Sequence, residues 1–189
     1  NRFYYFVDYI DDEIKKDILK FKNIGLIIEK KVFLLKNNLL NNIIKFCKKN
    51  KINFYIEDNY KIALKLGAHG IYLSSKNKKI STIFSKKLFI IGHVHSQKEF
   101  FFKKLQNCNL IILSPIFYNT KYNKYKILGI SRFNLMSLYW NKDLCCLGGV
   151  NSNNLKQIRM LKVNSVGFKK FIKEPKKKPV YFLSRRVNF

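Results

Sequence analysis

A long hydrophobic run is absent from this sequence. None of its apolar stretches approaches the roughly 18 consecutive residues that a membrane-spanning helix needs. The aromatic opening, Phe3-Tyr4-Tyr5-Phe6-Val7, is far shorter, and it lacks the basic start, apolar centre and small-residue cleavage site of a signal peptide. We therefore expect a cytoplasmic protein with no membrane partner.

Cysteine is also scarce, and its spacing argues against zinc and disulfide patterns. The four cysteines are Cys47, Cys108 and the adjacent pair Cys145-Cys146, with no C-x-x-C spacing among them. Free cysteine is among the most often buried residue types. We expect reduced thiols inside helices and strands.

Arginine is rare although the chain is strongly basic. Of 38 basic residues only five are arginine, and the formal net charge is +27. A surface that reads phosphates or bases usually favours the forked guanidinium of arginine. The lysines are spread through nearly every predicted element and mixed with many Asn and Ile, as in proteins of AT-rich genomes. We expect no dedicated nucleic-acid partner, although the charge would raise encounter rates with phosphorylated ligands at low salt.

Short apolar runs alternate regularly with helical patterns along the chain. Hydrophobic periodicity and β-branched content predict strands at residues 2–7, 23–29, 52–56, 67–73, 87–92, 110–117, 144–150 and 165–168. Helical spacing and capping residues predict helices at residues 11–20, 39–49, 58–66, 96–105, 131–140 and 152–161.

This alternation predicts a (β/α)8 TIM barrel as a single domain, because the strands are continuously apolar, as in a buried parallel sheet. The 189 residues, 47% of them hydrophobic, suffice for one full core. A doubly wound sheet is the alternative, but no G-x-G-x-x-G follows the first strand. We assign the barrel to residues 1–175 and a basic C-terminal tail to residues 176–189.

The end of the seventh predicted strand offers a phosphate cradle. Glycines let backbone N–H groups approach an anion closely, and the positive end of the following helix would add to this. Gly148 and Gly149 precede residues 150–153, which lead into the predicted helix. A tight strand-to-helix turn without a ligand explains the glycines equally well.

Further ligand groups are expected at the carboxyl ends of other strands, where TIM barrels carry their sites. Ser114 and the loop carrying Thr120 and Lys121 offer hydroxyl and ammonium donors to a phosphate group, and Gly167 ends the eighth strand. The alternative for the loop is a solvated basic segment, because lysine is rarely buried.

Histidines follow the fifth predicted strand on the same face. His93 and His95 could transfer protons near neutral pH, with helix capping or ordinary hydrogen bonding as the alternative. His69, before the fourth strand, is expected to be structural or solvated. Asp58 could act as a helix N-cap that needs no ligand.

Four ordered motifs resemble those of one enzyme family. They are Gly67-Ala68-His69-Gly70-Ile71-Tyr72-Leu73, Ile90-Ile91-Gly92 with His95-Ser96, Leu113-Ser114-Pro115-Ile116-Phe117 with Thr120 and Leu128-Gly129, and Leu147-Gly148-Gly149-Val150. In this order and spacing they look like the consecutive motifs of the thiamin phosphate synthase/TenI family, and they are similar to a divergent bacterial branch of it.

The resemblance implies a TIM barrel and the Mg²⁺-assisted joining of a pyrimidine-methyl diphosphate to a thiazole phosphate. It makes His95 and Lys30 the catalytic candidates, with Lys30 the only group kept from the family's Gln, Arg and Lys motif. It also places Asp58 on the metal, while Asn77 replaces the second metal carboxylate, which weakens a Mg²⁺ site. Pro115 stands where the thiazole-tautomerase branch has a histidine, so that activity is not expected.

Three functions therefore stay open. The first is a thiamin phosphate synthase of thiamin biosynthesis, a transferase acting on phosphorylated small molecules. The second is a family member without this activity that binds a thiamin precursor or another phosphorylated metabolite. The third is a basic barrel that binds RNA. The oligomeric state, including a homo-oligomer, is left open.

Overall fold

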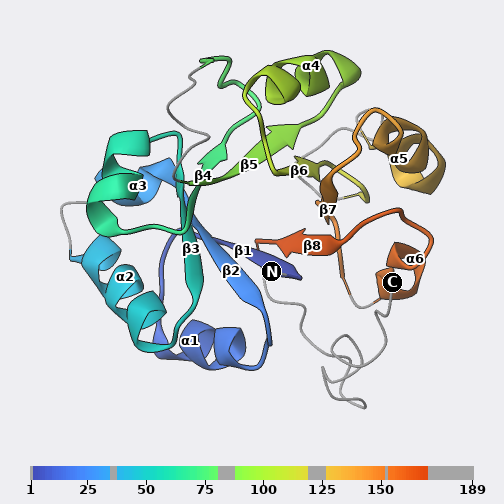
Figure 1. The fold of residues 1–189 in the computed structure, drawn as a ribbon. Coiled ribbons are helices and arrows are strands. Elements are labelled where there is room, and N and C mark those ends of the chain that lie inside the picture. Colours follow the sequence, from blue (N-terminus) through green and yellow to red (C-terminus); the bar gives the residue numbers. More distant parts are fainter. Residues whose placement is uncertain (1, 35–37, 81–87, 119–126, 152, 170–189) are drawn as a thin grey trace.

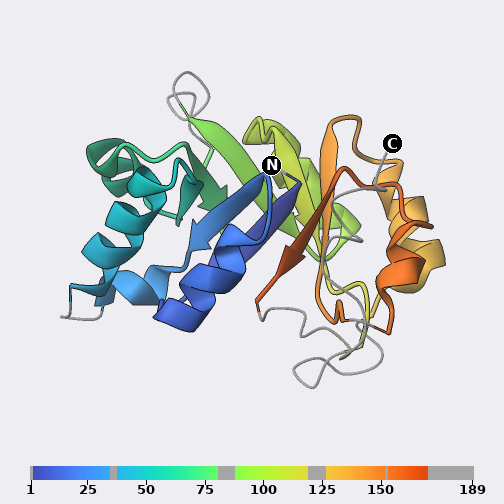
Figure 2. The same cartoon turned by 90° about the horizontal axis from the view of Figure 1, so that it is seen from below.

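Eight parallel strands close into a barrel in which each strand pairs with the next along the chain and the first pairs with the last. The computed structural model describes residues 2–34, 38–80, 88–118, 127–151 and 153–169. The helices lie around the outside of the strands (Figure 1), and the view from below shows the strands running between the helices on either side (Figure 2). The predicted TIM barrel is confirmed.

The strands are β1 (Phe3–Val7), β2 (Ile24–Ile28), β3 (Asn53–Glu57), β4 (Gly70–Leu73), β5 (Phe89–Val94), β6 (Leu110–Leu113), β7 (Asp143–Leu147) and β8 (Ser165–Phe168). The helices are α1 (Asp12–Leu19), α2 (Leu39–Lys49), α3 (Tyr60–Leu66), α4 (Gln97–Leu105), α5 (Gly129–Ser137) and α6 (Leu155–Ile158), and a 3₁₀ helix, η1, spans Lys30–Leu34.

Alternation along each strand separates two hydrophobic clusters. In β1 every residue is buried, but Tyr4 and Phe6 belong to a cluster built from strand residues alone, which is the barrel interior. Phe3, Tyr5 and Val7 belong to the larger cluster, which also contains the buried residues of the helices. Strands buried on both faces must be apolar throughout, which is why the runs could be found in the sequence.

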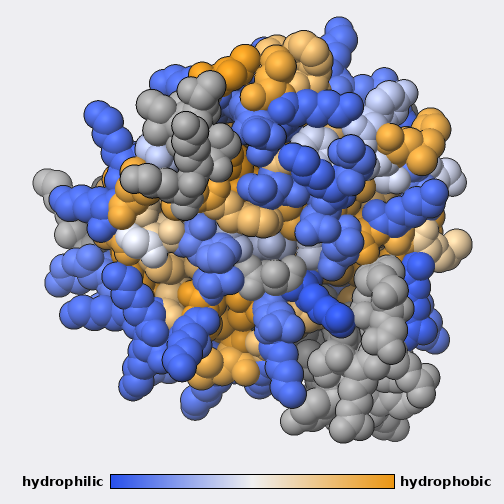
Figure 3. Space-filling view, viewed as in Figure 1, coloured by the Kyte–Doolittle hydropathy of each residue, from blue (hydrophilic) through white to orange (hydrophobic). Residues whose placement is uncertain are grey.

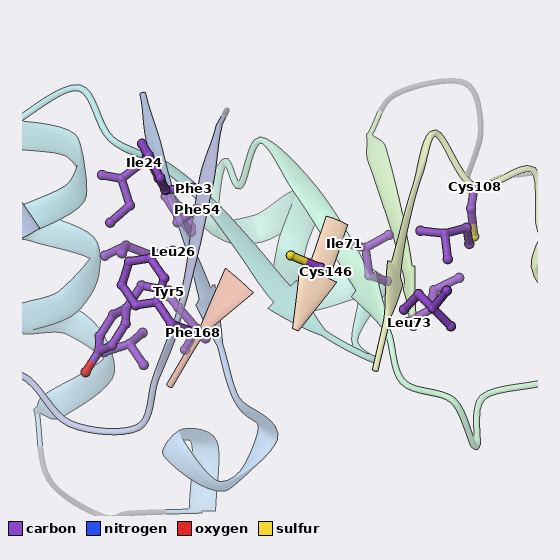
Figure 4. Packing of buried hydrophobic residues seen from close by; sticks show 14 of the residues in the cluster. Phe3, Tyr5, Ile24, Leu26, Phe54, Ile71, Leu73, Cys108, Cys146 and Phe168 are labelled. Atoms are coloured by element: carbon purple, nitrogen blue, oxygen red, sulfur yellow. The ribbon is translucent and has the colours of Figure 1, made fainter. Parts of the chain in front are cut away.

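The larger cluster fills the space between the strands and the helices. Figure 4 shows Phe3, Tyr5 and Leu26 close together on the helix side of the strands. Helix α1 buries Ile18 in this cluster and is N-capped by Asp11, whose carboxylate accepts a hydrogen bond from the Ile14 N–H at 2.7 Å. This cap satisfies one of the N–H groups that a helix start leaves without an intrahelical partner.

Several predicted boundaries were wrong, among them the ends of β6 and β7, which stop at Leu113 and Leu147. Strand β5 continues beyond Gly92 to Val94, because His93 and Val94 still pair with Ile112 and Leu113 of β6. Helix α5 begins at Gly129 and ends at Ser137, earlier than predicted at both ends. The last helix shrinks to the four residues of α6.

The four cysteines are buried and unpaired, as expected. Burial raises the pKa of the thiols of Cys47, Cys108 and Cys146 to about 12. We expect native protein at pH 8 to react with a thiol reagent such as DTNB on the order of a thousandfold more slowly than unfolded protein, because the thiolate is the nucleophile. Rapid release of thionitrobenzoate before denaturant is added would contradict this burial.

Hydrophilic residues are spread over the face shown in Figure 3, with hydrophobic surface between them. No helix among the described residues is long and apolar enough to cross a membrane. The predicted tail at residues 176–189 lies outside the described residues.

Candidate functional site at the carboxyl rim

The chain segments that leave β6 and β7 lie against each other. The Ile116 N–H donates to the Leu147 carbonyl at 3.0 Å, and the Phe117 N–H donates to the Gly148 carbonyl at 2.9 Å. A Cβ on Gly149 would lie 2.5 Å from both the carbonyl carbon of Phe117 and the carbonyl oxygen of Tyr118. The structure therefore brings the two rims together as one surface, as the sequence predicts.

The two glycines are needed for their conformation as well as for space. Gly148 and Gly149 have φ angles of 97° and 73°, in the region that side chains disfavour. No described residue accepts a hydrogen bond from either N–H group. Two adjacent N–H groups with no acceptor in the described ranges suit a phosphate cradle.

The expected helical contribution to this cradle is not present. The side chains of Asn151 and Asn154 both donate to the Gly149 carbonyl, at 3.2 and 2.7 Å, and the Asn151 N–H donates to the Asn154 side chain. Asn side chains that bind nearby backbone compete with helix formation, so α6 begins only at Leu155. The backbone of the glycine pair, without a helix dipole, has to supply the anion site.

The other predicted phosphate ligands differ in placement. Ser114 follows β6 directly and is buried, with 2% of its surface exposed. Gly167 lies within β8, where a Cβ would meet Leu147 at 3.2 Å and Cys145 at 3.5 Å, so it adjoins the interior side chains of β7. Thr120 and Lys121 lie outside the described residues.

A chain of hydrogen bonds crosses the rim from β4 to β6. The Tyr72 hydroxyl lies 2.6 Å from Nδ1 of His93, and Nε2 of His93 lies 2.7 Å from Oγ of Ser114. His95 Nδ1 lies 2.8 Å from the Ser114 carbonyl oxygen. Because a carbonyl only accepts, His95 carries its proton on Nδ1.

The placement of His93 corrects the sequence prediction. His93 is part of β5 and two residues beyond Ile91, an interior residue, so its side chain faces the barrel interior and not a loop. Its two ring nitrogens join two hydroxyls, so protons can be arranged in either direction along the Tyr72–His93–Ser114 chain. His95 lies after the strand, as predicted, and its N–H donates to Glu99 at 2.6 Å.

Burial, with neighbouring positive groups adding to it, holds the pKa of His93 well below its usual value. In unfolded protein this histidine titrates near pH 6.5. Below that pH the histidine becomes protonated in the unfolded state but stays neutral in the folded state. The contribution of His93 to folding stability is therefore present above about pH 6.5 and is lost as the pH falls.

We expect the free energy of unfolding to fall by up to roughly 1.4 kcal/mol per pH unit below pH 6.5, as measured by urea denaturation. His93→Phe should remove most of this slope. His69, whose pKa burial also lowers, adds a smaller effect of the same sign. Glu57, whose pKa burial raises, acts in the opposite sense at more acidic pH. Equal slopes in the two proteins would contradict the neutral state of His93.

Asp58 and Asn77, the predicted metal residues, are in direct contact. The Asn77 side-chain NH₂ donates to Asp58 Oδ1 at 2.8 Å, while the Ser74 N–H and hydroxyl donate to Oδ1 and Oδ2 at 3.0 and 2.6 Å. The alternative role of Asp58 as an N-cap is wrong, because Asn59 caps α3 by accepting from the Ile62 N–H.

These donors do not fit a Mg²⁺ site shared by Asp58 and Asn77. Mg²⁺ requires oxygen ligands in near-octahedral geometry. Asn77 turns its nitrogen toward the carboxylate, and its oxygen accepts from the Lys79 N–H at 3.0 Å. The amide orientation follows from its partners, since a carboxylate only accepts and an N–H only donates. The described residues also contain no group of three or more His, Cys, Asp or Glu that could hold a metal.

Carboxylates and lysines share the rim of β1, β2 and β8. Glu29 is paired with both Lys31 and Lys169, and Lys31 also pairs with Asp8. The backbone N–H of Lys30, the catalytic candidate, donates to Glu57 at 2.7 Å, and the side chain of Lys30 is exposed. The structure thus gives Lys30 a backbone role and places its ammonium in solvent.

Sequence reasoning missed Tyr72, Lys103 and Gln106. Tyr72 lies in an ordinary strand pattern, and Lys103 and Gln106 lie in an ordinary helix pattern. Such patterns do not show whether the polar end of a side chain is buried. For Lys103 a signal was available, because it follows Phe100 by three residues and therefore lies on the buried face of α4.

The comparisons with known proteins indicate one family and the same fold. A family model described as thiamine monophosphate synthase matches residues 36–170. The thiamine-phosphate synthase of Prochlorococcus marinus is 32% identical over 127 residues, which are 64% of this chain and 36% of that protein. That of Flavobacterium psychrophilum is 28% identical over 123 residues, 60% of each chain. The chain thus spans about a third to three fifths of the length of these relatives.

Solved structures show the same barrel. The thiamine phosphate pyrophosphorylase from Pyrococcus furiosus superposes with a TM-score of 0.68 at 15% identity, covering 88% of this chain and 84% of that one. The thiamine phosphate pyrophosphorylase from Bacteroides thetaiotaomicron gives a TM-score of 0.57 at 14% identity, covering 87% and 80%. At these identities the structures show the fold alone. On the match over residues 36–170, the chain belongs to the thiamine monophosphate synthase (TMP-TENI) family.

Proposed function

We propose that the chain forms thiamin phosphate by joining a pyrimidine-methyl diphosphate to a thiazole phosphate. The C–O bond between the pyrimidine methylene and the diphosphate breaks, diphosphate leaves with the electron pair, and the thiazole nitrogen forms a new bond to the methylene carbon. The single observation that carries this proposal is the Gly148-Gly149 backbone, whose N–H groups no described residue accepts, packed on the rim of β6. Such donors stabilise phosphate oxygens on a substrate or leaving group.

The buried rim would help by excluding water from the reacting carbon. A pyrimidine cation formed as diphosphate leaves reacts with any nucleophile within reach, so the thiazole must already be in place. Ser114, whose hydroxyl lies within hydrogen-bonding distance of both His93 and His95, directly precedes Pro115, the residue that adjoins Gly148. We propose that it orients a phosphate group or the thiazole ring.

The test is to incubate purified protein with both phosphorylated precursors and follow thiamin phosphate by its conversion to fluorescent thiochrome. We expect product from wild-type protein and at least about a tenfold loss for Ser114→Ala, the loss expected for one oriented hydrogen bond. Product formation by wild type at the rate of a heat-inactivated control would exclude the synthase activity.

A specific observation supports the alternative, a family member that binds a precursor without joining two. The described arginines, Arg2, Arg132 and Arg159, lie at the amino end of β1, in α5 and after α6, so none follows a strand at the carboxyl rim. Within the described ranges, a departing diphosphate would then have no bidentate guanidinium partner at this rim. Calorimetric binding of either precursor, with no thiamin phosphate formed from both, would establish this second function.

A further inference from the structure

A fully buried lysine binds the segment that carries Ser74 and Asn77, the two residues that donate hydrogen bonds to Asp58. Lys103 of α4 has 0% of its surface exposed. Its Nζ donates to the Ser74 carbonyl at 2.8 Å, to the Asn77 carbonyl at 2.9 Å and to Oε1 of Gln106 at 2.9 Å. Buried lysines are rare unless their charge is compensated.

The partners show that Lys103 is protonated. Two of the three acceptors are backbone carbonyls, which cannot donate. The third is the amide oxygen of Gln106. The orientation of this amide is fixed, because its nitrogen donates to the carbonyls of Asn77 and Lys79 at 3.0 and 2.9 Å. Three acceptors need three N–H groups, and only the ammonium form carries three.

Lys103 and Gln106 hold the segment that follows β4 against α4. The hydrogen bonds that their side chains make outside α4 go to residues 74–79. In the same segment, the side chains of Ser74 and Asn77 donate hydrogen bonds to Asp58. Burial lowers the pKa of Lys103, and the negative charge of the nearby Asp58 carboxylate acts in the opposite direction by attracting the ammonium. A divalent ion at this position would have the same two effects, joining the loops after β3 and β4 and neutralising the carboxylate.

We propose that the buried Lys103 ammonium replaces a divalent cation at Asp58, so that the rim binds phosphate groups without a metal there. The proposal rests on the proposed function only for the kind of ligand, a phosphorylated small molecule. Lys103 has no N–H left for that ligand, so it is a positioning residue. It keeps Asp58 from repelling the anion and holds the rim loops in place.

Thermal unfolding of the full chain with Mg²⁺ or Mn²⁺ alone tests the metal half of the proposal. We expect millimolar Mg²⁺ to shift the wild-type midpoint by less than about 1 °C, because a ligand stabilises only a state that binds it. Asn77→Asp is the matched variant, since it restores a second carboxylate beside Asp58. We expect its midpoint to fall without metal and to recover by several degrees with Mg²⁺.

Two outcomes would overturn this half. One is a wild-type midpoint that rises with Mg²⁺ as much as that of Asn77→Asp. The other is Mn²⁺ bound by the wild type, seen by electron paramagnetic resonance, and lost in Asp58→Asn.

Binding of inorganic phosphate with excess EDTA tests the role of Lys103. We expect the wild-type dissociation constant to be equal, within about twofold, in EDTA and in Mg²⁺. Lys103→Met, which keeps chain length but removes the charge, should weaken phosphate binding by about tenfold, an amount equal to roughly 1.4 kcal/mol. Lys104→Met, in which an exposed neighbouring lysine of α4 is replaced, is the control for lost net charge and should change affinity little.

The two proposals can fail separately. If no thiamin phosphate forms but phosphate binds equally in EDTA and Mg²⁺, the metal substitution stands and the synthase activity does not. If wild-type phosphate binding is abolished by EDTA, the metal substitution is excluded whatever the reaction, and this result does not depend on Lys103→Met folding.

Discussion

Gly149→Ala is expected to destabilise the fold by about 3 kcal/mol, and to weaken phosphate binding at the rim by at least about tenfold. Two costs combine in this estimate. A side chain at φ of 73° is strained, and the new Cβ would lie 2.5 Å from backbone atoms of Phe117 and Tyr118. Backbone cannot move aside as a flexible side chain would, so the segments after β6 and β7 must separate. Urea denaturation and calorimetry with inorganic phosphate measure the two effects.

Gly67→Ala provides a matched control. Gly67 ends α3 with φ of 66°, nearly the angle of Gly149, but a Cβ there would meet no atom within 4 Å. This variant should lose only about 1 kcal/mol, the strain of the left-handed conformation, and bind phosphate as the wild type does. Equal losses of stability in the two variants would show that the contact between the rims of β6 and β7 is not a constraint.

His93→Phe is expected to lower the free energy of unfolding by about 2–5 kcal/mol, because a buried polar group that loses its partner costs about 1–3 kcal/mol. Phenylalanine fills a similar space, but its ring cannot form the hydrogen bonds that His93 makes with the Tyr72 and Ser114 hydroxyls. The variant should also lose most of the proposed synthase activity, because Ser114 loses one of the two histidines that orient its hydroxyl. Urea denaturation at pH 7.5 and the thiochrome assay measure these effects.

His69→Phe is the control for the substitution itself. His69 is exposed and contacts the rings of Tyr55 and Phe89 with centroids 5.6 and 6.1 Å away, contacts that a phenyl ring can keep. We expect its stability to change by less than about 0.5 kcal/mol, as at most surface sites. Comparable losses in the two variants would mean that the hydrogen bonds of His93 contribute little.

The sequence by itself determined the barrel. Strands buried on both faces need uninterrupted apolar runs, so β1 to β8 could be recognised in the sequence. Helical spacing and capping residues located the helices, although the cap of α3 is Asn59 and not Asp58. Gly148 and Gly149 marked the turn that follows β7. These signals are local, because each depends on neighbours within a few positions of the chain.

Only the tertiary structure decided what the polar groups do. Three examples depend on contacts between residues about 20 to 30 positions apart in the sequence. They are the burial of Lys103, the hydrogen bond from the Asn77 nitrogen to Asp58, and the hydrogen bonds of His93 to Tyr72 and Ser114. The hydrogen bonds of a side chain are set by the acceptors and donors that the closed barrel brings to it. The same lysine on the opposite face of α4 would be a solvated charge. Helical spacing from Phe100 indicates which face Lys103 is on, but it does not show which acceptors the closed barrel brings to its ammonium.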